Sequence, residues 1–332
     1  MGRQPTQEDV ARAAGVSRGL VSLALSGTGS VAPATRERIL SAAKQLGYTR
    51  NFGAATLAAR RSPVVGVCLP SLRNPFFESV VSPLQRRVED AGLQPLITTS
   101  DNSPDRELAS LRRFIELRAA GVFMISPVGE LAALADCGAQ IPLVLIGAVM
   151  SAPHVPSVHI DEDAAAALVA AHARERGWTR IVAVSQTSPT LDRWVRHRQD
   201  ALRSAGAAAG IGVDVLALDD GAGLGDALAP FVRHSKADRP LVVAHNSLVA
   251  INIVAALRAV GIEPGQSVGL VSYDDTYLLA HPSFDITALS QNVDELAACA
   301  MDLLQQMGQA DDTAAFGAEQ LITPSLHARS TS

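Results

Sequence analysis

Apolar residues recur at helical spacing through the first 47 residues, which predicts three short helices. Thr6 is followed three positions later by Asp9, a capping-box pattern that opens the first helix. Gly15 supplies a residue that can take positive φ, Ser17 can cap the second helix, and the third is expected to begin near Pro33. We expect the helices to pack through Val10, Ala11, Ala14, Leu20, Val21, Ala24, Leu25, Ile39, Ala42, Ala43 and Leu46.

The second helix has an outer face, which at about 100° per residue carries Arg18, Gly19, Ser22 and Leu23. In a helix-turn-helix head this face enters the major groove, where an arginine can fork onto a guanine edge and a leucine can contact a thymine methyl. Arg18 and Ser22 are the expected base readers. The alternatives are that Arg18 contacts only phosphate, or that the three-helix head binds a protein.

From residue 62 onward, apolar strands alternate with longer helical stretches, which predicts parallel α/β architecture. The same arrangement repeats after Asp161, so two Rossmann-like lobes are implied. The expected strands are residues 64–69, 96–99, 122–126 and 143–146, and then 181–184, 213–218, 241–244 and 268–273.

Charge is unevenly distributed along the chain. Residues 1–61 hold nine Lys or Arg against three acidic residues, a balance of +6, whereas the remainder holds 19 against 30, a balance of -11. Such asymmetry favours a polyanion-binding end, although a basic tail that only aids solubility is the alternative reading.

Composition bounds the class of protein. A chain of 332 residues with 48% hydrophobic and 18% charged residues is expected to fold into two or three compact units. Three widely spaced cysteines offer neither a disulfide framework nor a CxxC metal site, which fits a reducing cytoplasm. We see no signal peptide and no apolar stretch long enough for a membrane span, so a cytoplasmic protein without membrane contact is expected.

Motifs along nearly the whole chain resemble, in order and spacing, those of the LacI/GalR (lactose repressor) family of bacterial transcriptional regulators. The head and hinge motifs are GVSRGLVSLALSG, TRERIL and GYTRNFGAATLAARR. The core motifs are SPVVGVCLPSLRNPFF, VVAHNSLVAINIVAALRAVGI, VSYDDTYLLAHP, ITALSQNVDELAACAMDLL and LITPSLHARST.

The resemblance implies an all-α helix-turn-helix head and an α/β periplasmic-binding-protein-like core of two Rossmann-like lobes. The expected domains are a DNA-binding head at 1–48, a hinge at 49–62 and an effector-binding, dimerising core at 63–332. Its lobes would be about 63–160 with 291–320, and 161–290 with 321–332, with crossings near 160, 290 and 320 and a cleft between them. Expected partners are double-stranded operator DNA, a sugar-like effector and a second copy of the chain.

In the hinge, Asn51, Ala54 and Leu57 match the family pattern, whereas Arg50 and Ala55 depart from it. By resemblance, Asn51 caps a short helix that forms on DNA, and paired Leu57 side chains wedge into the minor groove. Ordinary packing against the core is the alternative for Leu57. The full set of expected DNA-binding residues is Thr6, Ser17, Arg18, Gly19, Ser22, Leu23, Asn51, Ala54 and Leu57.

Ligands of such sheets bind beyond the carboxyl ends of the strands, so polar residues there are effector-site candidates. Asp274, Asn246 and Asp161 each follow a predicted strand, and Phe76 with Phe77 could form an apolar or stacking wall. The alternative for each is that it caps the following helix or packs locally.

The family's ligand-clamping arginine is in doubt, because counting back from Ala201 and Leu202 places Trp194 at its position. Arg193 or Arg196 could substitute, or Trp194 could stack on a sugar ring. Ser247, where the family commonly has aspartate, is a further departure.

The sequence contains partial matches to enzyme motifs, but none has the context or residues that the motif requires. Residues 15–19 fit GxSxG, but a helix rather than a strand precedes the serine. Asp226 occupies the third glycine position of a dinucleotide fingerprint after Gly221 and Gly223, and no HExxH motif occurs. We therefore expect no catalytic residues, metal or cofactor. The rival functions are a nucleoside- or purine-responsive regulator, a solute-binding protein without DNA activity, and an enzyme on a doubly wound fold.

Overall fold

The computed structural model describes residues 5–26, 30–49, 62–186, 192–218, 224–232 and 239–332. The chain divides into two compact units, Met1–Ser62 and Pro63–Ser332, and each is described by itself. In the described part of the chain, no helix is both long and apolar enough to cross a membrane.

The first unit consists of three helices, α1 (Gln7–Ala14), α2 (Arg18–Ser26) and α3 (Pro33–Gln45). The predicted capping box of α1 is present: the Thr6 hydroxyl accepts from the Asp9 amide, and the Asp9 carboxylate accepts from the Thr6 amide. Gly15 has a φ of 63° in the turn that follows. Ser17 accepts a hydrogen bond from the Leu20 amide at 3.3 Å and so caps α2, as predicted.

The core of this unit is made of small and β-branched side chains from all three helices. The buried residues are Val10, Ala11, Ala14, Val21, Ala24, Ile39, Ala42 and Ala43. The prediction for Leu46 was wrong, since its side chain is 39% exposed. The physical reason is that Leu46 is the C-cap residue of α3, so no further helical turn covers its side chain.

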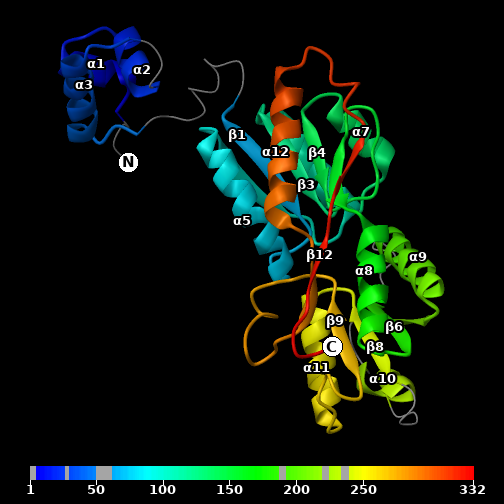
Figure 1. Ribbon diagram of the computed structural model, residues 1–332. Helices are drawn as coiled ribbons and strands as arrows, with labels where there is room; N and C mark the ends of the chain where they lie inside the picture. Colours follow the sequence, from blue (N-terminus) through cyan, green and yellow to red (C-terminus); the bar gives the residue numbers. More distant parts are fainter. Residues whose placement is uncertain (1–4, 27–29, 50–61, 187–191, 219–223, 233–238) are drawn as a thin grey trace. The chain divides into compact units, whose positions relative to one another are not determined.

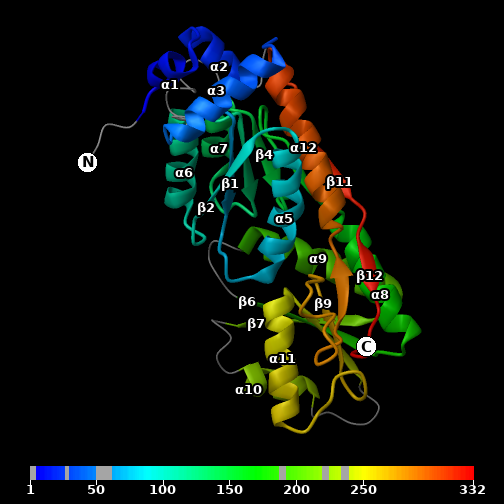
Figure 2. The same ribbon diagram turned by 90° about the vertical axis from the view of Figure 1, so that its left-hand side faces the viewer.

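The first sheet of the second unit is parallel throughout, with strand order β11-β5-β4-β3-β1-β2. Its strands are β1 (Val64–Leu69), β2 (Gln94–Thr99), β3 (Gly121–Ile125), β4 (Leu143–Ile146), β5 (Ser157–Ile160) and β11 (Glu319–Ile322). One face is covered by α5 (Pro75–Asp90) and α12 (Val293–Gln309), which run side by side (Figures 1 and 2), and the other by α6 (Pro104–Glu116) and α7 (Leu131–Gly138).

The second sheet has the order β12-β10-β9-β8-β6-β7. Its strands are β6 (Arg180–Gln186), β7 (Gly212–Leu218), β8 (Pro240–Ala244), β9 (Gly269–Ser272), β10 (Thr287–Ser290) and β12 (Ser325–His327). One face is covered by α8 (Glu162–Glu175) and α9 (Asp192–Ala209), and the other by α10 (Leu224–Val232) and α11 (Ser247–Ala259). All eight predicted strands are present, but β12 pairs antiparallel with β10, which the expectation of purely parallel order missed.

The chain passes between the two sheets after β5, after β10 and after β11. Asn292, with a φ of 46°, joins the second and third of these passages. Its amide nitrogen donates to the Thr323 carbonyl, and its amide oxygen accepts from the hydroxyls of Ser290 and Ser325 at 3.2 and 3.4 Å. Two of the three passages are therefore fixed to one another.

Candidate functional site

The outer face of α2 is exposed where the sequence predicts it. Arg18, Gly19, Ser22 and Leu23 are all exposed, while Val21 and Ala24 on the opposite side are buried. An exposed helical face that follows a tight turn is the arrangement with which helix-turn-helix heads enter a major groove.

Several other polar residues of the head stabilise the three helices. Thr6 and Ser17 serve as helix caps, so their contacts with DNA stay predictions. Arg36 donates to the Ala24 carbonyl at 3.2 Å, and Arg38 donates to the Ala14 carbonyl at 3.0 Å. These two guanidinium groups satisfy carbonyls near the ends of α1 and α2, and thus part of the head's positive charge also has a structural role.

The hinge candidates Asn51, Ala54 and Leu57 lie outside the described residues. Their roles therefore stay predictions.

Several buried polar side chains form a cluster, here called the Arg198 group, at the carboxyl ends of the second sheet's strands. Arg198 of α9 lies at its centre. Its guanidinium makes a two-pronged ion pair with Glu162, the first residue of α8, with Nη2–Oε1 at 2.8 Å and Nε–Oε2 at 3.2 Å. Nη1 donates to the His245 carbonyl, just past β8, at 3.1 Å. The guanidinium carbon lies 4.0 Å from the centre of the Tyr273 ring, which completes a tightly held arginine.

Arg198 was missed by the sequence reasoning, which considered Arg193, Trp194 and Arg196. The side chains of Arg193 and Trp194 lie outside the described residues, and Arg196 is exposed. A signal was available: Val195, Arg198 and Leu202 fall on one face of α9 at helical spacing, and both apolar members are buried.

Asp274, which follows β9, belongs to the same group and is 3% exposed. Its Oδ1 accepts from the Gln291 side chain at 3.0 Å, and its Oδ2 accepts from the Ser247 amide at 3.4 Å. Burial raises the pKa of Asp274 to about 6, against the opposing attraction of Arg198. The carboxylate is therefore mostly ionised at neutral pH and close to titration just below it.

Other polar atoms at or near these strand ends are buried as well. Burial, aided by the charge of Arg198, lowers the pKa of His245 to about 3, so its ring is neutral. Within the described residues, the hydroxyls of Ser247, Tyr273 and Thr276 are buried and have no hydrogen-bond partner. Unpaired buried hydroxyls are costly, and a bound water or ligand would satisfy them.

The other predicted effector residues divide into helix caps and core contacts. Asp161 accepts from the Ala164 amide and caps α8, and Asn246 accepts from the Val249 amide and caps α11, each at 2.9 Å. Both positions adjoin the Arg198 group in sequence, through Glu162 and Ser247. Phe76 and Phe77, in contrast, begin α5 and pack against the core of the first sheet, with their ring centroids 5.9 Å apart.

Comparison with known proteins assigns the chain to a family. The model of "Bacterial regulatory proteins, lacI family" matches residues 6–51, and that of "Periplasmic binding protein-like domain" matches residues 170–332. Together they match more than half of the chain. The chain belongs to the lacI family of bacterial regulatory proteins.

Relatives of full length support the assignment of this lacI-family chain. The regulator PtxS of Pseudomonas plecoglossicida is 28% identical over 303 residues, covering 90% of this chain and 88% of its own. The structure of a LacI-family regulator from Silicibacter pomeroyi has 25% identity and a TM-score of 0.79, covering 98% of this chain and 99% of its own. A complex of the regulator CelR with cellobiose shares the fold, with 24% identity and a TM-score of 0.68 over 99% of this chain and 100% of its own.

The predicted fold class, a helix-turn-helix head with a periplasmic-binding-protein-like core, is therefore confirmed. This lacI-family chain is a DNA-binding transcriptional regulator controlled by a small effector. Among the residues that the structure describes, no cluster of three His, Cys, Asp or Glu is placed to hold a metal ion.

Proposed function

We propose that this chain is a transcription repressor whose affinity for operator DNA is set by a polyhydroxylated effector, bound at the strand ends around Arg198 and Asp274. The observation that carries the proposal is the exposed face of α2, with Arg18, Ser22 and Leu23, in a head that has a net positive charge. Arg18 and Ser22 would read base edges, and the other head charges would neutralise phosphates.

The chemistry of the strand ends favours a sugar or sugar derivative. The ionised carboxylate of Asp274 donates no hydrogen bond, and each of its oxygens, which already accepts one from Gln291 or Ser247, has a further lone pair that suits a ligand hydroxyl. The amide of Asn246 both donates and accepts, and Phe76 with Phe77 supplies a candidate apolar wall. The cellobiose bound by CelR is consistent with this class. A nucleoside is the second candidate, because aromatic side chains also stack on bases.

We further propose that Asn51, Ala54 and Leu57 form the hinge contacts in the minor groove, within a head at 1–48, a hinge at 49–62 and a core at 63–332. The division of the chain after Ser62 is compatible with this scheme.

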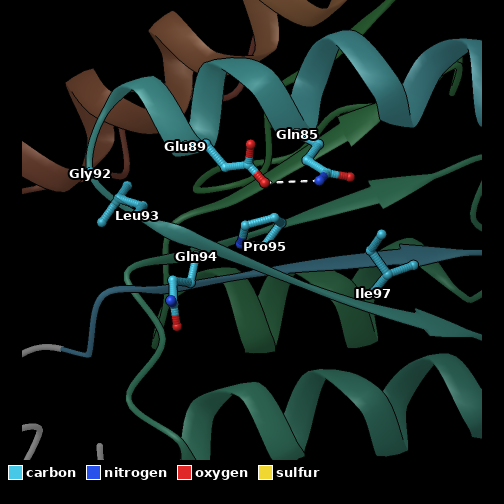
Figure 3. A pocket seen from close by; sticks show the side chains of 7 residues that line it. All are labelled: Gln85, Glu89, Gly92, Leu93, Gln94, Pro95 and Ile97. Carbon is cyan, nitrogen blue, oxygen red and sulfur yellow. Dashed lines mark hydrogen bonds between the residues drawn. The ribbon is translucent and has the colours of Figure 1, made fainter. Parts of the chain in front are cut away.

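The chain is proposed to act as a homodimer, and edge strand β2 is the candidate contact surface. Its Leu96 and Ile97 are 42% and 38% exposed, although they point to opposite faces of the sheet. Ile97 lines an open groove of about 770 Å³ between β2 and the last turns of α5, shown in Figure 3 with Gln85 and Glu89 on its rim. An edge strand with exposed apolar side chains can pair with a strand of another chain, and a second copy of this chain would cover it.

DNA from upstream of the chain's own gene provides the test of the proposed function. A labelled fragment should bind the full chain, and the slope of log affinity against log salt should be about -5 if six or so phosphates are neutralised. A sugar or nucleoside panel added to the complex should contain a compound that changes the affinity. A DNA affinity that does not change with salt concentration would contradict the proposed DNA binding.

A further inference from the structure

We propose that Glu162 sets the charge of the effector site: it holds Arg198 in an ion pair and thereby restricts the site to uncharged effectors, excluding sugar phosphates and sugar acids. This inference rests on the proposed function, because it takes the strand ends around Arg198 as the effector site.

The contacts of Arg198 leave little of its guanidinium for an anion. A free arginine fork binds carboxylates and phosphates through two parallel hydrogen bonds. Here Glu162 occupies that fork, His245 receives a third hydrogen bond through its carbonyl, and Tyr273 covers one face. Nη1 also lies 3.4 Å from Nδ1 of His245, so what remains is a single N–H donor on Nη2, which suits a hydroxyl oxygen of a neutral ligand.

Burial makes the pairing between Glu162 and Arg198 effective. Their side chains are 9% and 15% exposed, so water and salt screen the charges only weakly. Burial alone would lower the pKa of Arg198, but the net shift is upward because the Glu162 carboxylate stabilises the cation. An incoming anion would have to displace Glu162 and leave a buried carboxylate unpaired, which is strongly unfavourable.

The surrounding charges add to the exclusion of anions. Asp274 is mostly ionised at neutral pH, and the His245 ring is neutral. The next carboxylate, Asp275, is paired with Arg329 instead. Among the described residues, Arg198 therefore faces two carboxylates, and the net charge of the group is about -1 at neutral pH, which repels anions.

A purely structural role, in which the ion pair only fastens α8 to α9, is the rival explanation. Both roles predict that Glu162→Gln changes the melting temperature. Only the charge proposal predicts that the variant gains affinity for anions, because the fork of Arg198 would then be available without a competing carboxylate.

The experiment is calorimetric titration of the full chain with inorganic phosphate, and with D-glucose and D-glucuronate as a neutral and an anionic sugar, at fixed ionic strength. Glu162→Gln should bind phosphate at least about tenfold more tightly than the wild type, because a unit negative charge a few ångströms away has been removed. Glu175→Gln is the matched control: it removes the same charge from the exposed last turn of α8 and should bind phosphate as the wild type does. The double variant Glu162→Gln/Arg198→Gln should lose the gain, which separates the site from phosphate binding by the head.

Equal phosphate affinity of the wild type and a folded Glu162→Gln variant would overturn the proposal. If that variant does not fold, the wild type decides: release of operator DNA by glucuronate or by glucose 6-phosphate overturns the proposal, and a response confined to neutral sugars upholds it. Failure of the wild type to bind operator DNA would refute the proposed function, whereas release by an anion refutes only the charge restriction.

Discussion

The replacement Asp274→Asn should stabilise the protein at neutral pH while impairing its proposed function. Asp274 is held 3% exposed with its pKa at about 6, against an ordinary 3.8. A gap of about two pKa units corresponds to about 3 kcal/mol that burial of the charge removes from stability at neutral pH. The attraction to Arg198 is already included in that shift.

Asparagine carries no charge but satisfies one hydrogen bond fewer. Its oxygen can accept from Gln291, whereas its NH₂ group would face the Ser247 amide in place of a 3.4 Å hydrogen bond. Loss of that long bond costs about 1 kcal/mol. The net expected gain is about 2 kcal/mol, or about 4–8 °C in melting temperature for a unit of this size.

The dependence on pH identifies the cause. Near pH 4 the Asp274 carboxyl is protonated in the folded state and still about half protonated in the unfolded state, so its charge costs little stability and the substitution should have little effect. Between about pH 4 and 6 the folded state keeps a proton that the unfolded state releases, so the stability of the wild type falls as pH rises. The advantage of the variant should therefore grow by about 2 kcal/mol between pH 4.5 and 7.5.

Urea unfolding followed by circular dichroism at those two pH values measures the difference. Asp275→Asn is the matched control, since this neighbouring carboxylate is ion-paired with Arg329 at 2.8 Å and its loss should destabilise the protein by about 3 kcal/mol. A variant Asp274→Asn that is less stable than the wild type at pH 7.5, or whose advantage does not change with pH, would refute the reasoning.

Four further outcomes are expected. Asp274→Ala should abolish the effector response in an operator-release assay and spare operator affinity; a normal response would make Asp274 only a structural residue. Leu57→Ala should weaken operator binding without changing the melting temperature, and the reverse pattern would support packing against the core. Glu107→Ala should cost about 3 kcal/mol in urea unfolding, because the buried carboxylate accepts from the amides of residues 128 and 129 at 3.0 and 2.8 Å. Ile97→Lys should shift the sedimentation of the chain towards monomer, and an unchanged dimer would place the interface elsewhere.

Local signals in the sequence were sufficient for the head. The capping box of Thr6, the positive φ of Gly15 and the cap by Ser17 each depend on residues within a few positions, so a pattern along the chain specifies them. Helical periodicity failed at Leu46 because this residue caps the helix, and periodicity does not indicate whether a side chain at a helix end is covered by other residues.

Long-range pairings could not be obtained in this way. The sequence correctly placed Asp274 at the end of a strand. The ion pair of Glu162 with Arg198, in contrast, joins residues 36 positions apart on two helices. Helical spacing places Arg198 on the buried face of α9 and Arg196 on the exposed one, but this local pattern does not identify Glu162 as the partner of Arg198. The antiparallel pairing of β12 likewise depends on the last passage of the chain between the sheets.

The central claim is that one chain reads DNA through α2 and that an effector raises or lowers its affinity for this DNA. Fluorescence anisotropy of labelled upstream DNA tests the claim most directly. The wild type should bind with the steep salt dependence given above, and a sugar from the panel should change its affinity. Arg18→Ala should lose preference for that DNA over unrelated sequence, whereas Arg258→Ala, which removes an exposed charge from α11 in the core, should not. Binding by the wild type that is insensitive to salt, to sequence and to every member of the panel would contradict the account.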